Sequence, residues 1–244
     1  MGIRSIVLEQ GKYKTLTNEI CSDIIALIKR TKSRKFYKNA QVRFDPEEER
    51  PAFHKQDSQI RLGVYTSLRL DMVFAVYLKI NRDFGETRIL VDGYADEGVV
   101  TADGDIETIP SIEVNIAFPG ENEEQHYTEI MAWLKDVVRH EIEHLTQRGI
   151  NAKPGKHRNL NFSRRAAIAG TPEMYYKYYL LADEIEPNLH GLYTMARYKR
   201  QSLSTTISSY LDFLTTTGTI QEPHKKTILS KWRTVGKRLN LPKF

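Results

Sequence analysis

The chain has 244 residues, of which 40% are hydrophobic and 27% are charged, and its formal net charge is +5. This composition is ordinary for a globular protein with a hydrophobic core. The single cysteine, Cys21, excludes an intramolecular disulfide and a cysteine-rich metal site. Because the first residues lack the apolar run of a signal peptide and no stretch approaches the length of a transmembrane helix, we expect a cytoplasmic protein without membrane contact.

The positive charge is clustered in four segments, 29–35, 153–165, 197–200 and 225–238. Such clusters can bind nucleic acid or another polyanion. Solvated helix faces explain them as well, because no recognisable nucleic-acid-binding motif accompanies the charge.

The N-terminal part of the chain is predicted to contain one amphipathic helix, over residues 18–33. Thr17 or Asn18 would cap this helix. Its apolar face has helical spacing and consists of Ile20, Ile24, Leu27 and Ile28. Residues 45–59 are predicted as a loop.

Alternation of apolar with more varied residues predicts strands between about residue 60 and Pro119. The predicted strands cover residues 72–80, 88–91, 99–101 and 111–118. The pairs Asp92-Gly93 and Asp103-Gly104 are predicted as turns.

A long helix is predicted to follow, from about Asn122 to Gln147. Asn122 and Gln125 have the spacing of a capping box, and Gly149 is a suitable stop. The apolar residues of this helix form one stripe, made of Ile130, Leu134, Val138, Ile142 and Leu145. The helix is therefore predicted to be largely buried.

After a basic loop over about 151–170, the chain is predicted to be helical. Thr171 is a cap followed by proline at the first helical position. Asp183 begins a second capping-box pattern, and a helix from there to about Arg200 would place Pro187 in its first turn. Two more helices are predicted, over 204–216 and 223–239.

The order of a helix, then strands, then helices indicates an α+β fold with a twisted, mostly antiparallel sheet. An N-terminal part, residues 1–150, would contain the sheet and the long helix. A C-terminal part, residues 151–244, would be helical. The two parts are expected to form one compact unit.

The long helix carries the segment His140-Glu141-Ile142-Glu143-His144. Side chains four residues apart lie one above the other on a helix, so two neutral imidazoles at this spacing can hold one Zn²⁺ at about 2.0–2.1 Å. Glu141 would lie beside the metal without binding it. It can take a proton from an attacking water and pass it to a leaving amine. The segment therefore predicts a zinc site with a general base.

Two other interpretations of this segment stay open. The histidines can be a chance pair of core or surface side chains flanked by solvated glutamates. The segment also fits the inverted motif His-x-x-Glu-His, in which Glu143 would be the general base. The preceding strand and an acidic segment downstream favour the direct order, with Glu143 facing solvent or supporting a ligand.

A catalytic zinc site needs a third protein ligand and an open position for water. Gln147 and Ile150 occupy the positions of the metzincin glycine and third histidine, so that class is excluded. An acidic ligand on a downstream helix is the remaining option. Glu184, forty residues after His144 (184 − 144), is the best candidate, and Glu186 is the fallback.

The histidine motif followed by Glu184-Ile185-Glu186-Pro187 resembles the gluzincin pattern, in which the third ligand begins a Glu-x-x-Ala or Glu-x-x-x-Asp run. Pro187 and Asn188 stand where that pattern has Ala and Asp. With the tyrosine-containing run over 178–186 and the helical tail, residues 110–240 are also similar to metallopeptidases encoded by tailed bacteriophages. The resemblance implies a zincin-like fold and a zinc-dependent metallopeptidase.

The resemblance also implies roles for further residues. The strand before the motif helix would be the edge strand on which an extended peptide substrate pairs. Its pairing residues would be Ser111, Glu113 and Asn115. Asn188 would accept a hydrogen bond from a ligand histidine, and His190, Tyr193 and Arg197 are candidate donors to the oxyanion. As lone histidines, His157 and His190 are more typical of surface or packing residues.

Three functions fit these features. The first is a zinc-dependent metallopeptidase acting on a protein inside the cell; if encoded by a phage, it would process a virion or host protein in the host cytoplasm. The second is a virion structural protein whose domain binds metal without turnover and whose basic segments face nucleic acid or neighbouring subunits. The third is a protease that acts while bound to DNA.

Overall fold

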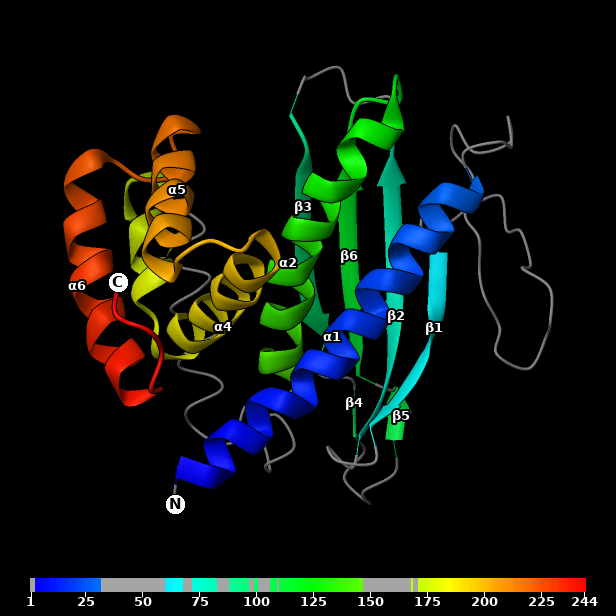
Figure 1. Ribbon diagram of the computed structural model, residues 1–244, viewed down its shortest axis with the longest axis horizontal. Coiled ribbons are helices and arrows are strands. Elements are labelled where there is room, and N and C mark those ends of the chain that lie inside the picture. The colour runs from blue at the N-terminus through cyan, green and yellow to red at the C-terminus, as the bar shows by residue number, and fades with distance from the viewer. Residues whose placement is uncertain are drawn as a thin grey trace. The chain divides into compact units, whose positions relative to one another are not determined.

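The computed structural model describes residues 3–31, 60–67, 72–82, 88–96, 99–100, 106–108, 110–146, 168 and 171–244 (Figure 1). The chain divides into two compact units, Met1–Leu145 and Thr146–Phe244. A sheet and helices make up the first unit and helices the described part of the second, so the α+β class is confirmed. Within these described ranges, no helix is long and apolar enough to cross a membrane.

The first unit is built on a four-stranded sheet in the order β1-β2-β6-β3. Its strands are β1 (Ile60–Ser67), β2 (Met72–Asn81), β6 (Ser111–Ala117) and β3 (Leu90–Asp96). β2 is antiparallel to β1 and parallel to β6, and β3 is antiparallel to β6. The sheet is therefore mixed, and β1 and β3 are its edges. Two short strands, β4 (Val99–Val100) and β5 (Ile106–Thr108), form a separate antiparallel pair.

The strands predicted over 72–80 and 111–118 are confirmed by β2 and β6. The prediction for the next strand is corrected, because β3 begins at Leu90 and continues through Asp92-Gly93, the pair predicted as a turn. Gly93 pairs with Val114 of β6, so long-range pairing outweighs the local turn preference of this dipeptide. The turn predicted at Asp103-Gly104 and the loop predicted over 45–59 lie outside the described residues.

Two long helices, α1 (Ile3–Thr31) and α2 (Tyr127–Thr146), cover one face of this sheet (Figure 1). The apolar stripe predicted for α2 is buried as expected, with Leu134, Val138 and Ile142 fully inaccessible. It packs with apolar residues of α1 and of the sheet in one core, which includes Ile20, Ile24, Ile28, Ile112, Val114 and Ile116. The alternation along β6 turns the apolar residues toward the helices, which fixes the face on which α2 lies.

The start of each helix in this unit differs from the prediction. α1 begins fifteen residues before residue 18 (18 − 3), and Thr17 lies inside it, where its hydroxyl donates to the carbonyl of Tyr13 at 2.6 Å. Before α2, Asn122 has a left-handed backbone and makes no side-chain cap, so the predicted capping box is absent. A capping side chain requires extended backbone at this position. A single turn of 3-10 helix, η2 (Glu123–His126), leads into α2 instead.

The second unit contains η3 (Pro172–Leu180), a 3-10 helix, followed by α4 (Ala182–Lys199), α5 (Leu203–Thr216) and α6 (Glu222–Arg238). The helices predicted over 204–216 and 223–239 are therefore confirmed. Trp232 is fully buried at the centre of this unit, and its indole N–H donates to the carbonyl of Tyr179 at 2.8 Å. The basic loop over 151–170 falls outside the described residues, apart from Ile168.

The start of α4 corrects the predicted capping box. Leu181 is the N-cap, because its extended backbone (φ −65°, ψ 136°) separates η3 from α4. Asp183 is the second helical residue and does not cap the helix. Pro187 is the sixth helical residue and lies in the second turn. Proline has no N–H, so one main-chain hydrogen bond of this turn is missing.

Candidate metal centre

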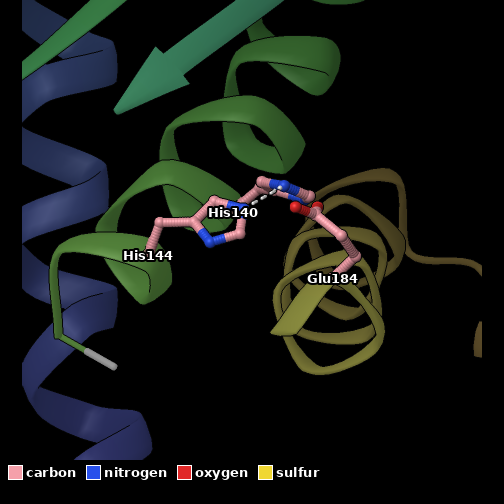
Figure 2. Close-up of side chains that lie close together, drawn as sticks. All are labelled: His140, His144 and Glu184. Carbon is pink, nitrogen blue, oxygen red and sulfur yellow. Dashed lines mark hydrogen bonds between the residues drawn. The ribbon is translucent and has the colours of Figure 1, made fainter. Parts of the chain in front are cut away.

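The two histidines of the motif lie together on the last two turns of α2. Their Nε2 atoms are 2.9 Å apart, and the ring centroids are 4.7 Å apart (Figure 2). Both side chains are half-buried. The spacing of four residues places them on one face of the helix, and the buried stripe on the other side leaves this face for polar groups.

The geometry of this pair suits a shared metal ion. Two nitrogens bound to a tetrahedral Zn²⁺ at about 2.0–2.1 Å lie about 3.3 Å apart. The Nε2 atoms of His140 and His144 are 2.9 Å apart. Small rotations of the two rings that increase this distance by about 0.4 Å would reach the separation of two zinc ligands.

Glu184 of α4 belongs to the same group. His140, His144 and Glu184 make up one group of side chains that could hold a metal ion, each offering one ligand atom, with these atoms within 4.8 Å of one another (Figure 2). The Glu184 side chain is fully buried. Burial of a carboxylate is costly unless opposite charge or hydrogen bonds compensate, and a divalent cation supplies such charge. Two histidines and one carboxylate are a donor set that zinc accepts.

A second group of potential ligands contains Glu143, Glu186 and His190. Glu186, the fallback third ligand, is thus grouped apart from His140 and His144. Asp183 belongs to neither group. On α4, Glu184 and Glu186 fall into different groups, because side chains two residues apart on a helix point about 200° apart.

Glu141 lies beside the histidine pair and against the edge strand. Its carboxylate oxygen Oε1 is 4.0 Å from His140 Nε2, and the side chain is buried. A Cβ placed on Gly93 of β3 would be 2.9 Å from Glu141 Cγ and 2.4 Å from Val137 Cγ1. The backbone of β3 therefore packs directly on the face of α2 that carries Glu141.

Gly93 has a different role from the one predicted from the sequence. Its neighbour Asp92 made it a turn candidate, whereas its role is to let β3 approach α2 closely. An isolated glycine inside an alternating segment is a signal for such an approach. That signal was present in the sequence but was outweighed by the Asp-Gly turn preference.

Glu143 has a different environment from Glu141. It forms a buried ion pair with Arg139, and the Arg139 guanidinium carbon is 4.5 Å from the centre of the Tyr13 ring of α1. Glu143 is therefore not solvent-facing, which corrects one of the two predicted positions. In the inverted motif the Glu143 carboxylate would have to leave this ion pair to act on a water molecule. This pairing favours the direct motif, with Glu141 as the base, over the inverted one.

The predicted substrate strand is corrected by the sheet order. Ser111, Glu113 and Asn115 lie in β6, which is an interior strand with partners on both sides. Glu113, for example, is in register with Tyr77 of β2 and with Tyr94 of β3. The backbone of β6 is thus already paired in both ladders and has no edge to offer to a peptide. The edge strand on this side is β3.

The remaining predicted residues lie on α4. Asn188 is buried, and its amide nitrogen donates to the carbonyl of Glu184 at 2.7 Å, so this hydrogen bond is made to the helix backbone. His190 and Tyr193 are half-buried, and Tyr193 packs against the core of the second unit. Arg197 is exposed near the end of the helix. His157 lies outside the described residues.

Comparisons of the chain with protein-family models, with curated proteins and with solved structures found no match. The candidate metal centre is thus defined by its own residues. These are two convergent imidazoles, a buried carboxylate in the same group, and a second carboxylate beside the first histidine.

Proposed function

We propose that this protein is a zinc-dependent metallopeptidase of the gluzincin type, with His140, His144 and Glu184 as metal ligands. The observation that carries the proposal is the convergence of the two Nε2 atoms, 2.9 Å apart, in one group with the Glu184 carboxylate. Three protein ligands are typical of catalytic zinc sites, and structural sites usually have four. A zincin-like fold is part of the proposal, supported by a motif helix that packs beneath a mixed sheet with an antiparallel edge strand.

Glu141 is the general base in this proposal. Bound zinc would lower the pKa of a water molecule toward about 7 and polarise the peptide carbonyl. In this proposal the Glu141 carboxylate, 4.0 Å from His140 Nε2, accepts the proton of the attacking water and returns it to the leaving amine. Its packing against Gly93 limits the side-chain conformations that it can adopt.

The substrate would lie along β3 rather than β6. β3 is the edge of the sheet next to the motif helix, and its residue Gly93 lies against Glu141. An extended peptide can add to such an edge through main-chain hydrogen bonds. The candidate oxyanion donors, His190, Tyr193 and Arg197, stay predictions from the sequence.

The first test is metal analysis of the purified protein. We expect about one equivalent of zinc per chain, as one three-ligand site requires, with loss in His140→Ala and in His144→Ala. Glu184→Gln should weaken zinc binding strongly, whereas the matched control Glu186→Gln should retain it. Full retention of zinc in both histidine variants would rule out the proposed zinc site. Retention of zinc in Glu184→Gln together with its loss in Glu186→Gln would identify Glu186, not Glu184, as the third ligand.

The second test separates an enzyme from a metal-binding structural protein. The zinc-loaded protein is incubated with a diverse peptide mixture, and cleavage is followed by mass spectrometry. We expect cleavage that disappears in Glu141→Gln although zinc is retained. Zinc binding with the same peptide pattern in the wild type and in Glu141→Gln would favour the alternative, a virion structural protein with a non-catalytic domain.

A further inference from the structure

Helix α6 has one strongly basic side. The residues of this side are Lys226, Lys231, Arg233, Lys237 and Arg238, all exposed, and together they are called the basic face. At about 100° per residue they fall within an arc of about 160°. Ile228, Trp232 and Val235 lie on the opposite side and are buried in the core of this unit. Three hydroxyl side chains, Thr227, Ser230 and Thr234, are exposed within the same arc.

The acidic residues of α5 and α6 do not neutralise the basic face. The two helices contain one acidic residue each, Asp212 and Glu222. Both form an ion pair with Lys225, at 2.6 Å and 2.8 Å. Lys225 therefore compensates the local negative charge, and the positive charge of the five basic-face residues remains in excess.

The length and chemistry of the basic face suit a run of phosphates. From residue 226 to residue 238 the helix rises about 18 Å, at 1.5 Å per residue. A nucleic-acid duplex carries one phosphate per about 1.7 Å of its axis, so about ten phosphates lie within that length. Lysine, arginine, serine and threonine are the side chains that most often donate to phosphate oxygens. All four residue types are present on this side of α6.

Two other anionic partners fit less well. A helix that lies on a membrane surface needs an exposed apolar side, whereas the large apolar residues of α6 are buried in the core. A protein interface usually has an aromatic or aliphatic centre within a polar rim. The basic face has no such centre.

From these observations we propose that the basic face of α6 binds the phosphate backbone of nucleic acid without sequence preference. This activity is independent of the metal centre, since no residue of the basic face belongs to either potential ligand group. It adds a binding function in the second unit to the proposed hydrolysis.

The experiment measures binding of the full chain to a fluorescent 20-base-pair DNA duplex by anisotropy, at salt concentrations between 50 and 300 mM. We expect the logarithm of the association constant to fall linearly with the logarithm of the salt concentration. Five phosphate contacts would give a slope of about −4.5, at about −0.9 per contact. A second duplex of unrelated sequence should bind equally well.

The test variant replaces four residues, Lys226, Lys231, Lys237 and Arg238, with glutamine. Arg233 is kept because its Nε donates to the carbonyl of Phe244 at 2.6 Å. We expect the slope to fall by about 3 to 4, since each lost phosphate contact removes about one, and the affinity at 50 mM salt to fall at least tenfold. All four residues are exposed, so the melting temperature should be unchanged.

A matched control removes the same charge elsewhere in the second unit, as Lys177→Gln, Arg197→Gln, Lys199→Gln and Arg200→Asn. Asparagine is chosen at position 200 because that residue has a left-handed backbone. The control should bind DNA with a nearly unchanged slope. An equal loss of DNA affinity in both variants would mean that binding depends on net charge alone, and it would overturn the proposal.

Two further measurements complete the test. If the variant with four substitutions does not fold, the wild type is acetylated with and without DNA and analysed by mass spectrometry. Bound DNA should protect Lys226, Lys231 and Lys237 from acetylation. Lack of protection at these lysines would overturn the proposal. Anionic phosphatidylserine vesicles serve as the competing partner, and tighter binding to vesicles than to DNA would assign the basic face to a membrane surface instead.

Discussion

Replacing Gly93 with alanine would place a methyl group where β3 lies directly on α2. The added Cβ would be 2.4 Å from Val137 Cγ1 and 2.9 Å from Glu141 Cγ. Ordinary carbon–carbon contacts are about 3.5–4.0 Å, so both overlaps are severe. Val137 is branched at Cβ and cannot move its methyl group away as a long flexible chain can. A shift of the Glu141 side chain alone would leave the closer overlap with Val137, so β3 must move away from α2.

The cost of this overlap can be estimated. Overpacking of a well-packed contact destabilises a protein by about 1–3 kcal/mol. Without the overlap the same change would stabilise, by about 0.4–1 kcal/mol, because Gly93 lies in a strand that alanine tolerates and alanine restricts the unfolded chain. The sign of the effect is therefore informative. We expect Gly93→Ala to lower the free energy of unfolding by about 1–3 kcal/mol.

Urea denaturation of Gly93→Ala, Val137→Ala and the double variant measures this directly. Val137→Ala removes the nearest overlapping methyl group, so the double variant should be more stable than the sum of the single changes predicts, by about 1 kcal/mol or more. A neutral or stabilising effect of Gly93→Ala, or additivity in the double variant, would refute the close approach of β3 to α2. The measurement needs no substrate and no metal.

Four further predictions follow from the motif helix and the core of the first unit. If Glu141 is the base, Glu141→Gln should keep zinc and lower the cleavage rate by about 10²–10⁴-fold. Glu143→Gln breaks the buried ion pair with Arg139 and should lower stability, but the rate of the folded, zinc-loaded variant should change little. The opposite ranking of the two rates in a peptidase assay would support the inverted motif. Chelation of zinc should lower the melting temperature of the wild type but not that of His144→Ala, because only the wild type binds the metal; equal melting shifts by calorimetry would contradict this. Arg139→Met should destabilise the protein by about 3–5 kcal/mol, because Glu143 is left buried without its guanidinium, and Arg139→Met with Glu143→Gln should recover part of that loss in urea denaturation. Burial raises the pKa of the Cys21 thiol to about 12, so a thiol reagent at pH 8 should label it only after unfolding; rapid labelling of the native protein would show that α1 does not bury it.

Patterns within one stretch of chain were sufficient to predict several parts of this protein. The apolar stripe of α2 has the helical repeat, and it is buried as expected because the same periodicity decides which side of a helix can face a core. Local periodicity was also sufficient for other elements. Alternation of apolar residues predicted the strands β2 and β6, and helical patterns predicted α5 and α6. The spacing of His140 and His144 also determines that the two imidazoles lie on one face, since this depends on the helix alone.

Other features depend on residues that are far apart in the sequence, and only the tertiary structure decided them. β6 became an interior strand because β2 and β3 pair with it on both sides, and no pattern within residues 111–118 specifies the number of neighbours. The pairing of Glu143 with Arg139 is local, but the Arg139 guanidinium also lies over the ring of Tyr13 of α1, which is far away in the sequence. Gly93 is a strand residue because it pairs with Val114 of β6, and a glycine is needed there because α2 leaves no room for a side chain. In each case packing between distant segments outweighs a local preference, because burial and strand pairing involve larger free energies than the choice of one turn or cap.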